Sequence, residues 1–428
     1  MLINKLKQIS SGQFIRNVGW LGGAELANRI FRLGTTVTLA RMFSAQDYGQ
    51  MAVVYTIFDF ATVFTLRGGI GTKIVQADRE DVKTICNTSY WLNWILCGSI
   101  FIIQCLAAIP IAQFYGNNQL IWLLCTSALI YLMMPLYMVH SALLQRENRL
   151  KITAIANATQ SLLGNFMTVT LALGGMGIWA IVLPMVLTTP VWIVINWKNH
   201  SWRPPKLFSL EKWQEVTYFG KNLLLVEVLN KLRGNLDYLI IGRFIGIEAL
   251  GVYYFAFNAG SGISMNVINA FMSALFPHIC TARTDYEQFK KRYFTSLKKV
   301  SLFVIPFIVL QSSLAPLYVP IIFGKKWLSV IPILIMICLS GIPRIFAWAS
   351  NLLLNALNKT HITLYLNIFF TIFFAISILI AVNWGIFGVA VAVLISHLFV
   401  LPVLTIWTHQ YIFNKHLFSH KSFQINKH

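Results

Sequence analysis

Charge is scarce in this sequence, and negative charge is scarcest. Only 11% of the 428 residues are charged, compared with about 25% in ordinary soluble domains, and 14 acidic residues face 34 basic ones. Hydrophobic residues make up 57% of the chain and recur in runs of about 20 along nearly its whole length. No stretch is left for a separate globular domain. The sequence therefore predicts an all-α polytopic membrane protein.

Motifs of catalysis, metal binding and nucleic-acid binding are also missing. The chain has no G-x-S-x-G, no H-E-x-x-H and no phosphate-cradling glycine loop, and none of its six cysteines forms a C-x-x-C pair. Its net charge of +20 is not arranged as a basic stripe with interleaved aromatic residues. We therefore expect no enzyme, no cofactor, no metal site and no nucleic-acid partner.

Twelve apolar segments have the length of a membrane-spanning helix. They cover residues 18–40, 50–71, 88–112, 119–141, 152–173, 177–197, 217–241, 249–276, 297–319, 328–353, 362–382 and 385–409. The basic N-terminal stretch lacks a short apolar core with a cleavage site, so the first segment is interpreted as a spanning helix and not a cleaved signal.

Basic residues alternate from loop to loop. If the N-terminus is cytoplasmic, 25 Lys and Arg residues fall on inner segments, whereas only Arg41, Arg243, Lys325 and Lys326 fall on outer loops. Cytoplasmic loops carry such an excess in membrane proteins. The count predicts that both termini face the cytoplasm and that the number of crossings is even.

The two halves of the chain match each other across a hydrophilic segment at 198–216, which contains Pro204 and Pro205. A shift of 202 residues places Glu25 on Glu227 and Arg29 on Lys231, a shift of 210 places Asn148 on Asn358, and a shift of 208 places Gly177 on Gly385. We expect two six-helix lobes, 1–197 and 217–428, joined by a cytoplasmic linker. An even helix number makes this a parallel repeat, for which alternating access is the default mechanism.

Ionisable residues lie inside several of the predicted spans, where they are costly and mark candidate functional sites. The cations are Arg29, Arg32, Lys231, Arg233 and Arg344, and the acids are Glu25, Asp59, Glu227 and Asp237. One hypothesis is structural, because Glu25–Arg29, Glu227–Lys231 and Arg233–Asp237 have the i,i+4 spacing of helix ion pairs. The other is that the cations, being in excess, bind an anionic cargo. The acids are candidates for ion coupling.

A polar stripe in the eighth span leaves two interpretations open. Asn258 and Asn266 are its candidate binding residues, with Ser261, Asn269 and Ser273 on the same segment. Their amide and hydroxyl groups suit a sugar, and they suit hydrogen bonds between helices equally well.

The stretch LARMFSAQDYGQMAVVYTIFDF, residues 39–60, resembles the first loop and second helix of polysaccharide transporters. These belong to the multidrug/oligosaccharidyl-lipid/polysaccharide exporter superfamily. IIGRFIGIEALGVYYFAFNA, residues 240–259, is similar to the family's second-lobe version, and GIWAIVL and GIFGVAVAVLIS resemble its lobe-ending helices.

That resemblance implies a flippase of the bacterial inner membrane that moves an undecaprenyl-pyrophosphate-linked oligosaccharide for O-antigen, capsule or exopolysaccharide synthesis. It implies membrane lipid and the polysaccharide polymerase machinery as neighbours. By helix position, it places the family's basic cavity residues at Arg29, Arg32, Lys231 and Arg233. A cation-coupled multidrug antiporter of the same superfamily remains an alternative, and a membrane-embedded glycan polymerase is a more distant one.

Overall fold

The computed structural model describes residues 31–283 and 285–413, and in this part of the chain it contains helices and no strand. The chain divides into two compact units, Met1–Asn235 and Leu236–His428. The division falls inside helix α11 (Trp213–Phe244), whereas the sequence predicts a boundary at the linker 198–216.

The first unit is a bundle of helices and broken helices. Its described elements are a helix over 31–42, α3 (Ala45–Val63), α4 (Arg67–Gln76), α5 (Val82–Tyr115), α6 (Gln119–Met133), α7 (Pro135–Arg146), α8 (Leu150–Leu173), α9 (Trp179–Leu187), α10 (Thr189–Asn199) and the first part of α11. Helix α5 packs on α6 and α7, α4 packs on α7, and α8 packs on α9 and α10.

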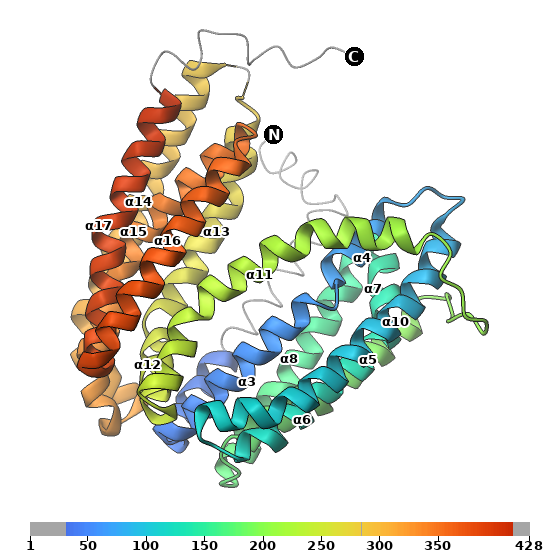
Figure 1. The fold of residues 1–428 in the computed structure, drawn as a ribbon, viewed down its shortest axis with the longest axis horizontal. Helices are drawn as coiled ribbons and strands as arrows, with labels where there is room; N and C mark the ends of the chain where they lie inside the picture. The colour runs from blue at the N-terminus through green and yellow to red at the C-terminus, as the bar shows by residue number, and fades with distance from the viewer. Residues whose placement is uncertain (1–30, 284, 414–428) are drawn as a thin grey trace, which may run out of the picture. The chain divides into compact units, whose positions relative to one another are not determined.

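The second unit continues from α11 with longer helices. Its elements are α12 (Ile247–Ala259), α13 (Ser261–Cys280), α14 (Tyr286–Tyr318), the short turns Val319–Phe323 and Lys325–Val330, α15 (Ile331–Ala356), α16 (Thr360–Ala381), the turn Val382–Trp384 and α17 (Gly385–Phe413). Helix α15 is the centre of this bundle, because α13, α14 and α17 all pack against it. Figure 1 shows α14 to α17 running alongside one another.

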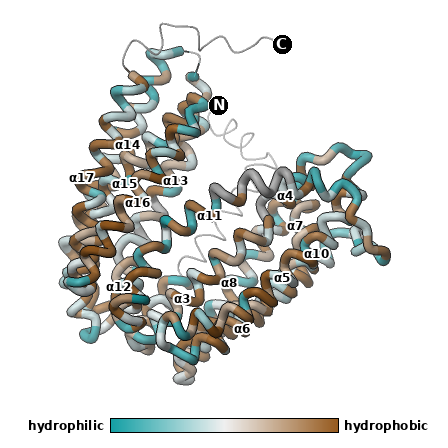
Figure 2. Tube along the Cα trace, viewed as in Figure 1, coloured by the Kyte–Doolittle hydropathy of each residue, from teal (hydrophilic) through white to brown (hydrophobic). Residues whose placement is uncertain are grey.

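Length and hydropathy make this a multi-pass membrane protein. Five helical stretches in the described residues are long and apolar enough to cross a membrane, and the bent pair α6–α7 supplies a sixth if it is one span. In Figure 2, hydrophobic residues run along the helices and hydrophilic ones gather at their ends and in the connections. The all-helical, polytopic prediction is confirmed, while the number twelve stays a prediction.

Several predicted spans prove to be broken helices. The segment 50–71 divides into α3 and α4 at a turn where Leu66 has a left-handed φ of 52°. The segment 119–141 bends by 50° between α6 and α7, where Pro135 lacks the N–H that would continue the ladder. The segment 249–276 divides at Gly260. In a membrane, such irregular backbone is tolerated only where protein or a water-filled cavity surrounds it.

Residues with positive φ occur at matching positions in both halves of the sequence. Asn148 and Asn358 follow α7 and α15 with φ of 55° and 58°, and the next residue donates back to Leu144 O and Leu354 O respectively, each at 2.9 Å. Gly177 and Gly385 also have positive φ. Asn148 and Asn358, which the sequence repeat pairs, thus share a left-handed φ and the same backbone hydrogen bond, and both paired glycines have positive φ.

Candidate functional site

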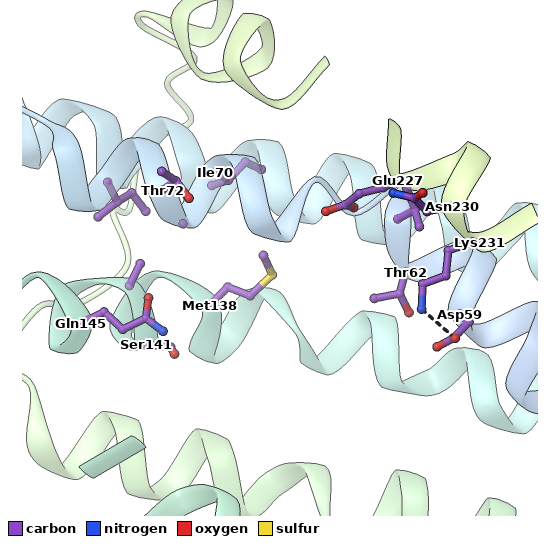
Figure 3. Close-up of a pocket in the computed structure, with 14 residues that line it drawn as sticks. Asp59, Thr62, Ile70, Thr72, Met138, Ser141, Gln145, Glu227, Asn230 and Lys231 are labelled. Carbon is purple, nitrogen blue, oxygen red and sulfur yellow. Dashed lines mark hydrogen bonds and ion pairs between the residues drawn. The ribbon is translucent and has the colours of Figure 1, made fainter. Parts of the chain in front are cut away.

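A cavity of about 540 Å³ lies among four helices of the first unit. Binding sites for small molecules commonly have volumes of about 300–1,000 Å³. The described lining residues come from α3 (Asp59, Thr62, Val63), α4 (Ile70, Gly71, Thr72, Ile74), α7 (Met138, Ser141, Ala142, Gln145) and α11 (Glu227, Asn230, Lys231). Figure 3 shows the polar members of this set spread along the cavity.

The α3 wall of the cavity is fixed at both ends. At its start, Ser44 Oγ accepts from the Asp47 N–H at 3.1 Å while Asp47 Oδ2 accepts from the Ser44 N–H at 2.9 Å, which forms a capping box. Near its end, the Phe58 ring stacks on Tyr131 of α6, with centroids 5.5 Å apart. These contacts hold the last turn of α3, which carries Asp59, against the bundle.

The α4 wall is anchored by one arginine. Arg146, in the last turn of α7, donates from Nη1 to Ile74 O and Val75 O, each at 3.0 Å, and to Ala77 O at 2.5 Å. The last carbonyls of a helix lack partners within it, and a guanidinium satisfies them and opposes the helix dipole. Helices α4 and α7 therefore keep a fixed spacing on either side of the cavity.

An ion pair joins α3 to α11 at the cavity wall. Lys231 Nζ donates to Asp59 Oδ2 at 2.7 Å, and the side chains remain 40% and 49% exposed. One hypothesis from the sequence pairs Lys231 with Glu227, four residues before it, whereas its partner Asp59 lies 172 residues away on another helix. Both charges stay accessible from the cavity (Figure 3).

Charge in the cavity is mixed. Glu227 lies one helical turn before Lys231 on α11 and is exposed, so the described lining residues carry two carboxylates and one ammonium group. The arrangement provides one cation for an anionic ligand, with a carboxylate that competes for it.

Neutral hydrogen-bonding side chains fill much of the remaining wall. They are Thr62, Thr72, Ser141, Gln145 and Asn230. The Thr62 hydroxyl donates to Phe58 O at 2.6 Å and keeps its oxygen lone pairs as acceptors. A wall of hydroxyl and amide groups suits a ligand with many hydroxyl groups. These residues are not among the sequence-predicted site residues, although Ser141 and Gln145 share a helix face at i,i+4.

The other sequence-predicted residues of the first unit are not among the described lining residues of this cavity. Glu25 and Arg29 are outside the described residues. Arg32 is exposed on the helix over 31–42, where its carbonyl accepts from the Thr36 hydroxyl at 2.7 Å. Arg233 is half-buried on α11 and is absent from the described cavity lining.

In the second unit, Asp237 belongs to a buried network. The side chain is 5% exposed, Oδ2 accepts from the Tyr253 hydroxyl at 2.8 Å, and Oδ1 accepts from the Tyr238 N–H at 3.0 Å. The Arg344 guanidinium lies over the Phe257 ring at 5.9 Å and acts electrostatically on the Asp237 carboxylate. Asp237 is therefore hydrogen-bonded within the second unit, and its role and that of Arg344 in binding stay predictions.

The predicted polar stripe is divided by the break at Gly260. Asn258 is exposed on α12 and donates to Tyr254 O of its own helix at 2.8 Å. The Ser261 hydroxyl is buried and donates to Ile337 O at 3.1 Å. The side chain of Asn266, on α13, lies outside the described ones. The side chains of Asn258 and Ser261 therefore bond to backbone.

No group of three or more His, Cys, Asp or Glu residues in the described chain is arranged to hold a metal ion. All six cysteines are free thiols.

Sequence comparison finds a family and named relatives. The family described as "Polysaccharide biosynthesis protein" matches residues 38–332, which is more than half of the chain. The teichuronic acid biosynthesis protein TuaB of Bacillus subtilis is 25% identical over 383 residues, covering 89% of this chain and 77% of that protein. The succinoglycan biosynthesis transport protein ExoT of Rhizobium meliloti is 25% identical over 328 residues, covering 76% and 65%.

Comparison with solved structures finds a shared fold. An inward-facing multidrug resistance transporter of the MATE family, in the MOP superfamily, superposes with a TM-score of 0.70 at 15% identity and covers 90% of this chain and 94% of that one. The lipid II flippase MurJ, in an inward closed conformation, gives a TM-score of 0.68 at 14% identity and covers 92% and 87%. At this level of identity the likeness establishes a membrane-transporter fold.

Proposed function

Since this chain belongs to the polysaccharide biosynthesis protein family, we propose that it is a flippase for a lipid-linked oligosaccharide in the bacterial inner membrane. The cargo class is an undecaprenyl-pyrophosphate-linked glycan destined for surface polysaccharide. Transport in ExoT and flipping in MurJ are activities of relatives and neighbours that support this choice. Polysaccharide polymerase machinery would receive the cargo on the far side.

The proposed architecture is two lobes of six helices with both termini in the cytoplasm. The alternation of 25 inner and 4 outer basic residues supports the orientation. Matched left-handed positions such as Asn148 and Asn358 support the repeat. Alternating access follows from such an architecture, since two similar halves can rock around a shared path.

The observation that carries the proposal is the accessible Lys231–Asp59 pair at the wall of a polar cavity. A cation within a spanning segment costs about 2.5–3.5 kcal/mol on insertion scales, so it persists where it has a role. Lys231 offers three donors, of which the bond to Asp59 uses one. The others are available to a phosphate oxygen that enters the cavity.

The proposed binding step is an exchange of partners. A pyrophosphate oxygen replaces Asp59 Oδ2 on the Lys231 ammonium group, while the hydroxyl and amide groups of Thr62, Ser141 and Gln145 receive sugar hydroxyls. Asp59 then loses its partner and becomes available to a proton or a cation. Cargo binding and cation uptake would thereby be linked at one residue pair.

A second candidate function has its own supporting observation. The described cavity lining carries two carboxylates against one cation, and a cation-coupled multidrug antiporter would use such an acidic site. In that case Asp59 and Glu227 bind the coupling ion or a cationic drug, and Lys231 keeps Asp59 charged. Cargo charge therefore discriminates the two functions.

Reconstitution of the purified protein into lipid vesicles tests the choice. The vesicles contain a fluorescent undecaprenyl-pyrophosphate oligosaccharide, and a membrane-impermeant reductant reports how much of it reaches the outer leaflet. We expect wild-type protein to expose the inner-leaflet pool and Lys231→Met to lose this activity. Lys83→Met is the matched control, because Lys83 is exposed in the first turn of α5, outside the described cavity lining.

Two results would overturn the proposal. One is a wild-type protein that leaves the inner-leaflet pool protected while it drives a cationic dye out of the same vesicles against an ion gradient, which selects the antiporter. The other is flipping by Lys231→Met at the wild-type rate, which would show that cargo binding does not need the Lys231 ammonium group.

A further inference from the structure

The segment between α10 and α11, residues 200–212, is folded onto the first unit. Trp91 Nε1 of α5 donates to Leu207 O at 2.9 Å, and the Thr88 hydroxyl donates to Glu211 O. The Trp202 ring meets Tyr90 edge to face at 6.0 Å. A connection that makes hydrogen bonds and ring contacts along its length has a defined position, unlike a solvated tether.

The middle of this segment exposes large apolar side chains. Leu207 is 82% exposed and Phe208 is 62% exposed, and Trp213, at the start of α11, is 48% exposed. Their backbone is held in place, so these side chains are presented outward. The Phe208 and Trp91 rings meet edge to face with their centroids 5.4 Å apart, and Phe208 stays largely uncovered. Exposed apolar groups on a fixed support mark an interaction surface.

The exposed apolar residues of helix α5 indicate the depth of this surface relative to a bilayer. Exposed apolar residues on α5 begin at Ile95 and continue through Ile102, Ile103, Leu106 and Ile109 to Phe114. From Ile95 to Phe114 the helix rises about 29 Å at 1.5 Å per residue. That matches the bilayer's hydrocarbon thickness of about 30 Å. Trp91 lies one helical turn before Ile95, where head groups meet the hydrocarbon and where tryptophan gathers in membrane proteins.

We propose that Leu207 and Phe208 insert into the lipid head-group layer and anchor the connecting segment to the membrane surface. The hydrogen bond from Trp91 places Leu207 at this level, and the ring contact places Phe208 beside it. Lys206 is exposed immediately before them and suits a lipid phosphate. The partner is therefore phospholipid at the bilayer face reached by the N-terminus of α5.

Contacts within the protein hold both ends of the segment 200–212 in place. Arg203 Nη1 donates to His200 O at 2.7 Å and to Trp202 O at 2.8 Å, and Pro204 and Pro205 follow directly. At the other end, Lys212 Nζ contacts Asp81 Oδ2 at 2.6 Å, and this hydrogen bond raises the pKa of the Lys212 ammonium group. Both ends of the loop are held before it meets lipid, which lowers the entropy lost on insertion.

Depth-dependent quenching in vesicles tests the anchor. An environment-sensitive fluorescent amino acid is introduced at position 207 or 208, which leaves the six cysteines in place. The protein is reconstituted with phospholipid carrying a nitroxide near its carbonyl group, and iodide serves as the water-soluble quencher. We expect lipid-borne nitroxide to quench positions 207 and 208 more strongly than iodide does.

Position 211 is the matched control, since Glu211 is exposed in the same segment and its polar side chain should stay in water. There the order of the two quenchers should be reversed. Iodide quenching at 207 and 208 equal to that at 211 would overturn the proposal, whatever the transported cargo is.

The variant Trp91→Phe tests whether the hydrogen bond from Trp91 positions Leu207 for insertion into lipid. This variant keeps an aromatic ring but loses the Nε1–H that holds Leu207 O. We expect lipid quenching at position 207 to fall while the protein stays folded. Unchanged quenching at 207 would contradict the positioning role of Trp91.

Discussion

In the first unit, Asp59 and Lys231 are paired at a cavity wall and stay about half exposed, whereas in the second unit Asp237 is 5% exposed beneath the Tyr253 hydroxyl. The two units otherwise share local features. Helices α3 and α12 begin at Ala45 and Ile247, separated by the same shift of 202 residues that places Arg29 on Lys231.

The units diverge where these helices end. Helix α3 continues to Val63 and breaks at Leu66, beside the cavity, while α12 stops at Ala259 before Gly260. A Cβ on Gly260 would lie 2.7 Å from Cys338 Sγ, so the second break is closed by tight packing. The difference is that the charged pair of the first unit is accessible from a cavity, whereas the Asp237 carboxylate of the second unit is buried and hydrogen-bonded.

Removal of the buried hydroxyl in the second unit should have the largest effect on stability. Tyr253→Phe leaves the Asp237 carboxylate buried with one donor fewer, and hydrogen bonds to charged groups contribute about 1.5–3 kcal/mol. We expect a loss of that size in the free energy of unfolding, measured in mixed detergent micelles.

The matched change in the first unit is Asp59→Asn, which alters an ion pair that is about half exposed. Exposed pairs contribute about 0–1 kcal/mol, so the loss should be smaller than for Tyr253→Phe. Equal losses in the two variants would remove the contrast between the units.

The break at Gly260, between α12 and α13, should not accommodate an added methyl group. Gly260→Ala places a carbon against Cys338 Sγ and 2.9 Å from Ala256 O, and such overpacking costs about 1–3 kcal/mol. Gly234→Ala in α11 is the control, because no heavy atom lies within 4 Å of its added Cβ. Thermal unfolding should separate the two variants, and a Gly260→Ala protein as stable as Gly234→Ala would show that the break is not closed by packing.

The left-handed positions that both halves share should give equal losses in the free energy of unfolding, smaller than the loss for Tyr253→Phe. Asn148→Ala and Asn358→Ala each place alanine at a left-handed position, which costs about 1–2 kcal/mol. Glycine at either position should recover the loss, since it adopts positive φ freely. Unfolding midpoints of the four variants check this, and unequal losses for the two alanines would weaken the repeat.

Much of the fold could be predicted from apolar length. The segments 152–173, 362–382 and 385–409 agree closely with α8, α16 and α17. The breaks could not be located, because hydropathy does not register backbone conformation: Leu66 is apolar yet left-handed, and it divides the segment 50–71. Helices α5 and α14 begin before the predicted spans because their first turns are polar. The family resemblance of residues 39–60 is confirmed by the family match.

The charges of the site could be predicted and their pairing could not. Asp59, Glu227 and Lys231 stand out as ionisable residues in apolar segments. Local spacing favours partners four residues away, whereas Lys231 pairs with Asp59 through a contact that only the folded bundle creates. Neutral residues such as Ser141 and Gln145 carry a weaker signal, since hydroxyl and amide groups are common inside membrane helices.

The most direct test of an exchangeable pair is the flipping rate of the double variant Asp59→Asn/Lys231→Met in reconstituted vesicles. If Lys231 served only to neutralise Asp59, removal of both charges would remove the penalty at both positions and restore the activity that Lys231→Met loses. Our account predicts that the double variant folds, reaches the membrane and stays inactive, because the ammonium group that receives the pyrophosphate is gone. Flipping at the wild-type rate would contradict it and leave the pair with a structural role.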